Sequence, residues 1–149
     1  RTIIMDTRIQ DHFKNGSFIK TKSGILYILH AVLSNLTFVC TIWSIYATFP
    51  PCVWIEVVSF SGFVLALVLL LINMIQIPSD LGCIPWDVVE IIYTSIWAFF
   101  FAIIGIVDGE FARKSNDSVL GAATFFALLA MGLLVTHTFL LIHNRRSKN

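Results

Sequence analysis

The chain has little charge, and it lacks the residue patterns that carry most enzyme chemistry. Charged residues make up 13% of its 149 residues, against about 25% in typical soluble domains. It contains no His-Glu-x-x-His, Gly-x-Ser-x-Gly or Cys-x-x-Cys pattern and no phosphate-binding loop. Its net charge of +1, without a basic aromatic face, gives no sign of nucleic-acid binding. We therefore expect no catalytic activity, no cofactor, no bound metal and no nucleic-acid partner.

Long apolar segments take the place of these features. Hydrophobic residues make up 57% of the chain, and its mean hydropathy is +0.84. About 20 apolar residues suffice for a helix to cross a bilayer, and four segments exceed that length: residues 23–49, 53–77, 86–108 and 119–143. They are apolar on all sides, which is typical of membrane helices. The sequence therefore predicts an all-α, four-helix transmembrane bundle over 23–143, with tails at 1–22 and 144–149.

The distribution of basic residues predicts the orientation in the membrane. Eight of the ten Lys and Arg residues lie in the two tails, and the other two lie between the third and fourth segments. An even number of spans puts both tails on one side, which the positive-inside rule makes cytoplasmic. The connection around Asp80 would also be cytoplasmic although it has no basic residue, but acidic residues weigh little in this rule. We expect a multi-pass protein of the plasma membrane or endomembrane vesicles.

The connections between spans carry two candidate modification sites. Cys83, on the expected cytoplasmic side, is a candidate for palmitoylation, with a free thiol as the alternative. Asn116 begins an Asn-Asp-Ser glycosylation sequon on the expected luminal side, although it lies close to the bilayer. Cys52 is the one cysteine expected in an oxidising space, so no intramolecular disulfide is expected. Pro50 and Pro51 are expected to end the first helix and to force an extended turn.

Three ionisable residues fall at similar depth in different spans. His30, Glu90 and His137 each lie about 8–10 Å from the expected cytoplasmic end of their span. Ionisable groups at membrane depth are costly and suggest function. They form either a polar clamp that fixes helix packing or a proton path or ligand site, unless their common depth is a coincidence. We expect Glu90 to pair with His30, because these two groups could share one proton. Glu56 and Asp108, nearer the luminal ends, are expected to be solvated.

Small residues mark candidate contacts between helices. Small side chains in membrane helices allow close backbone approach. The residues of this type that we single out are Ser59, Ser61, Gly62, Gly121 and Gly132.

The order of these features resembles the MARVEL-domain tetraspan proteins, with the chemokine-like-factor and MAL/plasmolipin types as the nearest branches. The resemblance covers roughly residues 18–146. Its motifs are Lys22-Ser23-Gly24-Ile25-Leu26, Glu56-Val57-Val58-Ser59-Phe60-Ser61, Ile84-Pro85-Trp86-Asp87 and Gly121-Ala122-Ala123-Thr124-Phe125-Phe126-Ala127. Similar members often place Glu where His30 stands, so the resemblance implies that a family role of that acidic group is either lost here or converted to a pH-sensitive version. Claudins, connexins and tetraspanins need larger, cysteine-bearing loops that this chain lacks.

The resemblance implies a non-enzymatic role in organising membrane domains, in vesicle trafficking, or in stabilising another membrane protein. The residues themselves support recognition within the bilayer, either of another membrane protein or of a second copy. The alternative is an auxiliary subunit of a channel or transporter with a polar site at His30, Glu90 and His137. Residues 98–107 of the third segment offer no polar side chain, which favours the first interpretation.

Overall fold

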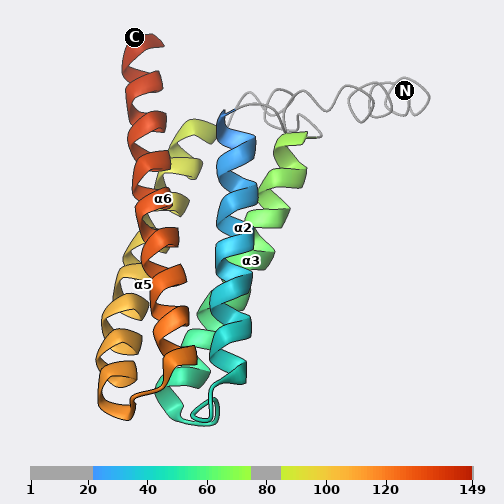
Figure 1. Cartoon of the computed structure of the whole chain (residues 1–149). Coiled ribbons are helices and arrows are strands. Elements are labelled where there is room, and N and C mark those ends of the chain that lie inside the picture. Colours follow the sequence, from blue (N-terminus) through green and yellow to red (C-terminus); the bar gives the residue numbers. More distant parts are fainter. Residues whose placement is uncertain (1–21, 75–84, 149) are drawn as a thin grey trace, which may run out of the picture.

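The computed structural model describes residues 22–74 and 85–148 and contains four long helices (Figure 1). Their bounds are Lys22–Trp43 for α2, Pro50–Met74 for α3, Trp86–Ser115 for α5 and Ser118–Lys148 for α6. Each is long and apolar enough to cross a membrane. No strand occurs in these two stretches of chain. The all-α, four-helix membrane fold predicted from the sequence is therefore confirmed.

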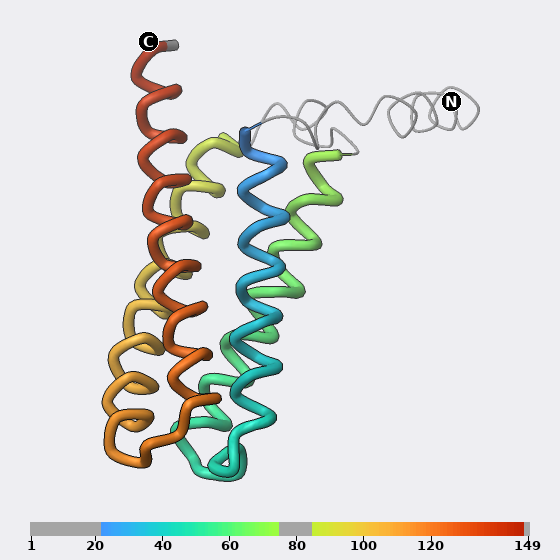
Figure 2. Tube along the Cα trace, in the orientation of Figure 1, coloured from blue at the N-terminus to red at the C-terminus, as the bar shows by residue number. Residues whose placement is uncertain are grey.

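The four helices run alternately up and down. α2 begins and α6 ends at one end of the bundle, called here the terminal end, and the two short connections α2–α3 and α5–α6 form the turn end (Figure 1). α6 packs against both α5 and α2, and α2 also packs against α3, whereas α3 and α5 make few contacts. α6 extends past the other helices at the terminal end (Figure 2).

The two prolines act differently from the sequence prediction. α2 ends at Trp43, and the chain turns over residues 44–49 through backbone hydrogen bonds such as Phe49 N to Tyr46 O at 2.9 Å. Pro50 and Pro51 then open α3. Proline suits the first helical turn because the N–H that it lacks would have no partner there and its φ is already helical. The expected extended turn is therefore wrong: the prolines start the second helix.

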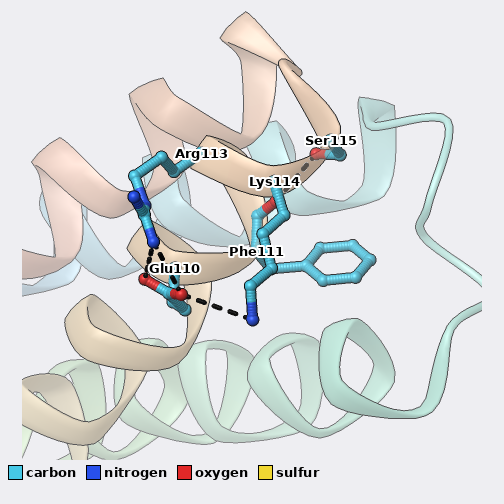
Figure 3. A network of polar contacts seen from close by, with 5 residues as sticks. All are labelled: Glu110, Phe111, Arg113, Lys114 and Ser115. Atoms are coloured by element: carbon cyan, nitrogen blue, oxygen red, sulfur yellow. Dashed lines mark hydrogen bonds and ion pairs between the residues drawn. The ribbon is translucent and has the colours of Figure 1, made fainter.

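The expected connection at 109–118 is also mostly helical. α5 continues to Ser115, where the Ser115 hydroxyl donates to Phe111 O at 2.9 Å. Glu110 pairs with Arg113 at 3.0 Å and with Lys114 at 3.3 Å (Figure 3). These partners are three and four residues apart, a spacing that supports a helix rather than a loop.

The apolar core comes from three of the four helices. Its buried members are Ile55, Val58, Trp97, Ala98, Phe101, Ile104, Ala127, Ala130 and Leu134. They belong to α3, α5 and α6, and α2 adds only the partly buried Leu33. The outer faces carry large exposed apolar side chains, such as Phe99 and Phe139, as expected for helices surrounded by lipid. The buried face of α2 must therefore be of a different kind.

Candidate functional site

Polar side chains make up most of the buried face of α2. They recur every three or four residues, which places them on one helix face. None is more than 6% exposed. We call this set the polar stripe; its members are Tyr27, His30, Ser34, Thr37 and Thr41 of α2, with Ser44 directly after the helix. A membrane helix turns such groups towards protein rather than lipid, because an unpaired polar group in hydrocarbon is costly.

At the terminal end of the stripe, the four helices each contribute one polar side chain. Asn73 of α3 donates through Nδ2 to Glu90 Oε1 of α5 at 3.0 Å and to its own Leu69 O at 2.9 Å. The Tyr27 hydroxyl interacts electrostatically with the Glu90 carboxylate, although it forms no hydrogen bond of acceptable geometry. The Tyr27 ring meets the ring of His137 edge-on, with centroids 5.0 Å apart. We call Tyr27, Asn73, Glu90 and His137 the polar layer.

His30 lies one helical turn further into the bundle than Tyr27. Its ring meets that of Phe101 edge-on at 5.7 Å between centroids and lies 6.2 Å from that of Tyr93. Neither ring nitrogen of His30 has a hydrogen-bond partner in the described chain. The expected hydrogen bond between Glu90 and His30 is therefore absent, and Asn73 takes that place. Counting depth along the sequence could not reveal how far each helix is rotated about its own axis.

Sequence reasoning passed over Asn73 and Tyr27. Asn73 lies near the end of the second apolar segment, at the depth of Glu90 on the neighbouring segment. An amide at that depth is costly unless it has a partner. That cost could have indicated from the sequence that Asn73 pairs with Glu90. Tyr27 gave a weaker indication, because tyrosine is common near the ends of membrane helices.

Acidic side chains gather at the turn end. Asp108 is only 1% exposed, and neither of its carboxylate oxygens has a hydrogen-bond partner in the described chain. Glu56 is partly buried, with Oε1 unpartnered. The buried Cys52 lies in the neighbourhood of both carboxylates and of Asp117. The expectation that Asp108 is solvated is wrong, because the α5 extension carries it inside the helical part of the bundle. Within 22–74 and 85–148, no His, Cys, Asp and Glu side chains form a group that could hold a metal ion.

The small residues singled out from the sequence divide into two groups. Ser59 and Gly62 are buried inside the bundle, and a Cβ on Gly62 would lie 3.5 Å from the Trp97 ring. Ser61 is partly exposed, and a Cβ added to Gly121 or Gly132 would meet nothing within 4 Å. These three therefore lie away from the helix contacts of this chain.

The close contacts of α6 use other small residues. A Cβ on Gly105 of α5 would come within 2.5 Å of Leu128 of α6. Three alanines of α6, namely Ala123, Ala127 and Ala130, are completely buried. Their spacing of four and three residues places them on one face of α6, and the sequence had already indicated Ala127 and Ala130 as small residues that allow close approach.

The two candidate modification sites differ in what the structure describes. Asn116 is exposed and ends α5 in the left-handed conformation, with φ of 55°. Asn is one of the few residues that adopt this conformation readily. Cys83 lies outside the described residues.

Comparison with known proteins agrees with this architecture. The MARVEL family, described as a membrane-associating domain, matches residues 18–140. Plasmolipin of Danio rerio is 27% identical over 117 residues, which are 75% of this chain and 65% of the plasmolipin chain. The chain thus spans a little under two thirds of the length of that relative. No solved structure matches it. With a family match over most of its length and four membrane-length helices in the matching fold, this chain belongs to the MARVEL family of multi-pass membrane proteins.

Proposed function

We propose that this chain is a non-enzymatic membrane protein that organises membrane domains, or traffics and stabilises a partner membrane protein, through lateral helix contacts. The observation that carries the proposal is the small size of the described connections, residues 44–49 and 116–117. They leave the outer faces of the helices as the main described surface. Membership of a family described as membrane-associating supports the same function.

The outer face of α6 is the best-supported contact surface. Phe125, Gly132 and Phe139 are spaced seven residues apart and therefore lie on one face. Phe125 is 59% exposed and Phe139 is 69% exposed, while a Cβ on Gly132 would meet nothing within 4 Å. Two large rings thus flank a position where the backbone is bare. A second helix can approach closely at such a position, and van der Waals packing stabilises helix pairs in lipid.

Gly132→Leu tests this surface. The variant should fold normally but lose partners that co-purify with the wild-type chain in mild detergent. Ser95→Leu is the matched control, because Ser95 is also small and exposed, but on α5. Trimming the tails to about Ser17 and Arg146 should leave association intact. If trimming abolished association and Gly132→Leu had no effect, recognition would lie in the tails and this proposal would be wrong.

Gly62→Leu does not test lateral contacts, although the sequence alone suggested it. Gly62 faces Trp97 and Phe101 inside the bundle, so a larger side chain there would disturb the fold rather than an outer surface.

The second candidate function is that of an auxiliary subunit of a channel or transporter with a polar site at His30, Glu90 and His137. The observation that favours it is the near-complete burial of both histidines, each 1% exposed. Identification of the co-purifying protein discriminates the two candidates. A channel or transporter whose transport changes when Glu90 is replaced by Gln would support the second.

A further inference from the structure

One asparagine of α2 faces outwards from the bundle, deep inside the membrane. α2 has 22 residues, a length of about 33 Å that matches the hydrocarbon core of about 30 Å. Along the helix axis, Asn35 is about 20 Å from Lys22 and about 12 Å from Trp43. α2 packs against α3 and α6, yet Asn35 is exposed. Its short side chain therefore lies among hydrocarbon and reaches neither membrane surface.

An exposed amide differs from the exposed hydroxyls of the bundle. Ser61, Ser95 and Thr136 each donate to the backbone carbonyl four residues earlier in the same helix, at 2.7, 2.7 and 2.9 Å. A hydroxyl has one donor, so its own helix satisfies it. An asparagine amide has two N–H donors and an accepting oxygen, and mid-helix backbone N–H groups already donate within the helix. The Asn35 oxygen can therefore find a donor only on another helix, and in hydrocarbon such a partner is favoured over lipid.

The apolar residues in line with Asn35 have the spacing of a helix-pairing surface. They alternate at intervals of three and four residues, the heptad pattern by which the side chains of two helices interlock. We call this set the α2 seam; its members are Ile25, Ile28, Val32, Asn35, Val39 and Ile42. Ile25, Val32 and Ile42 are exposed, and the other two apolar members are partly buried. The amide thus stands within an apolar surface on which a second helix can pack.

We propose that a second copy of this chain packs on the α2 seam, with the two Asn35 amides hydrogen-bonded to each other. Two copies inserted in the same orientation place Asn35 at the same depth. The amide is complementary to itself because it carries both donors and an acceptor, and a twofold axis along the membrane normal brings the same residue of both copies together. A single asparagine in a helix-pairing surface also fixes register and oligomeric state. The α2 seam and the outer face of α6 are on different helices, so this dimer goes beyond the proposed function and does not depend on it.

Energy transfer between labelled copies tests the proposal. Donor- and acceptor-labelled full chains are mixed in phosphatidylcholine vesicles at a series of protein-to-lipid ratios. Transfer between wild-type chains should rise with protein density and saturate. Asn35→Leu should still fold, since leucine suits both helix and lipid, but should weaken self-association about tenfold through the loss of the amide pair. Asn35→Gln keeps an amide and should retain most of it. Ser61→Ala is the control, because its own helix satisfies that exposed hydroxyl, and should have no effect.

Oxidative cross-linking tests the same contact with Asn35 in place. Val32 lies on the α2 seam one turn before Asn35, and Ile96 is the same number of residues into α5. Both side chains are 49% exposed, so they differ mainly in the helix that carries them. Val32→Cys should add a disulfide-linked dimer to any that the native cysteines form in the wild type, whereas Ile96→Cys should not.

The possible outcomes separate this dimer from other contacts. Wild-type energy transfer at the level of random mixing, equal association of wild type and Asn35→Leu, or equal cross-linking at positions 32 and 96 would each overturn the proposal. A wild-type chain that is monomeric in vesicles, but loses a co-purifying membrane protein when Asn35 is replaced by Leu, would assign the α2 seam to that protein and overturn the dimer. Gly132→Leu should leave self-association unchanged, so failure of the α6 surface and failure of the α2 seam are distinguishable.

Discussion

Among single residues, Asp117 joins the two halves of the bundle at the turn end. As the residue before α6, its Oδ1 accepts the backbone N–H groups of Val119 at 2.9 Å and Leu120 at 3.4 Å. This is the pattern of a helix N-cap. Its Oδ2 accepts the Ser44 hydroxyl at 2.6 Å, which ties the cap to the end of α2. The Ser44 hydrogen bond, followed by these backbone N–H groups, holds the pKa of Asp117 below its ordinary value.

We expect Asp117→Ala to lower the free energy of unfolding by about 1 kcal/mol at neutral pH, the usual cost of losing such a cap. Because the folded-state pKa is lowered, the ionised cap stabilises the fold above the unfolded-state pKa of about 3.9. That contribution is lost as the pH falls through the lower folded-state value.

Asp117→Asn is the control, because it keeps an acceptor and cannot titrate. Thermal unfolding in detergent should show the difference between wild type and Asp117→Asn shrinking as the pH falls below about 4. A difference that stays constant over that range would contradict this role of the ionised carboxylate.

The hydrogen bond between Asn73 and Glu90 leads to a second prediction. Asn73→Ala and Glu90→Gln should each lower thermal stability in detergent, and the double variant should lose less than the sum. The coupling should be about 0.6 kcal/mol, the average for such contacts in membrane bundles. Glu90→Gln combined with Ser95→Ala, on the exposed side of α5, provides the comparison pair and should be additive. Equal additivity in both cycles would mean that the Asn73–Glu90 contact contributes nothing.

At the scale of helices, length and hydropathy predicted their number but not their ends. Four apolar runs sufficed because only helices and closed barrels satisfy the backbone inside a bilayer. Pro50 was read as a terminator although proline also favours helix starts. Glu110 and Arg113 were read as loop residues although their spacing suits a helix. In both cases the residue type was compatible with two local structures.

The contact between α5 and α6 gives a prediction about two glycines. Gly105→Leu should lower the free energy of unfolding by about 1–3 kcal/mol, as overpacking does, because even a Cβ there meets Leu128 at 2.5 Å. Gly132→Leu places the same side chain on the bare outer face of α6 and should leave stability unchanged or improve it, since leucine favours helix more than glycine does. Circular-dichroism melting of both variants in one detergent checks the contrast. Equal loss at the two positions would show that the α5–α6 contact is not as close as described.

In the molecule as a whole, the interior is divided between an apolar core and one polar helix face. The sequence showed the polar residues of the first span, but counting them helix by helix made a path across the membrane look thin. The structure shows which of them face the interior: Ser34, Thr37 and Thr41 are completely buried, whereas Asn35 is exposed. The third apolar segment lacks polar residues over 98–107, yet its Asp108 is buried just beyond them. Which side of each helix faces inwards depends on packing, and the sequence pattern left it open.

The orientation of the whole molecule remains a prediction from its charges. Eight of the ten basic residues lie in the two tails, so we expect both tails in the cytoplasm. Epitope tags on either tail should be labelled in cells only after the membrane is permeabilised. A tag inserted after Asn116, at the opposite end, should be labelled on intact cells when the protein is at the cell surface. Labelling of either tail on intact cells would reverse the assignment.

α6 runs without a break through residues 144–148, beyond the ends of its three neighbours (Figure 1). A group joined to Lys148 through a continuous helix would therefore point in a direction set by its angular position around the axis of α6. One residue inserted after Asn144 would rotate an attached group by about 100° around the helix axis, while four would nearly restore its direction and move it about 6 Å outwards. Short insertions in the last turns of α6 therefore change the direction in which an attached domain points without altering the bundle.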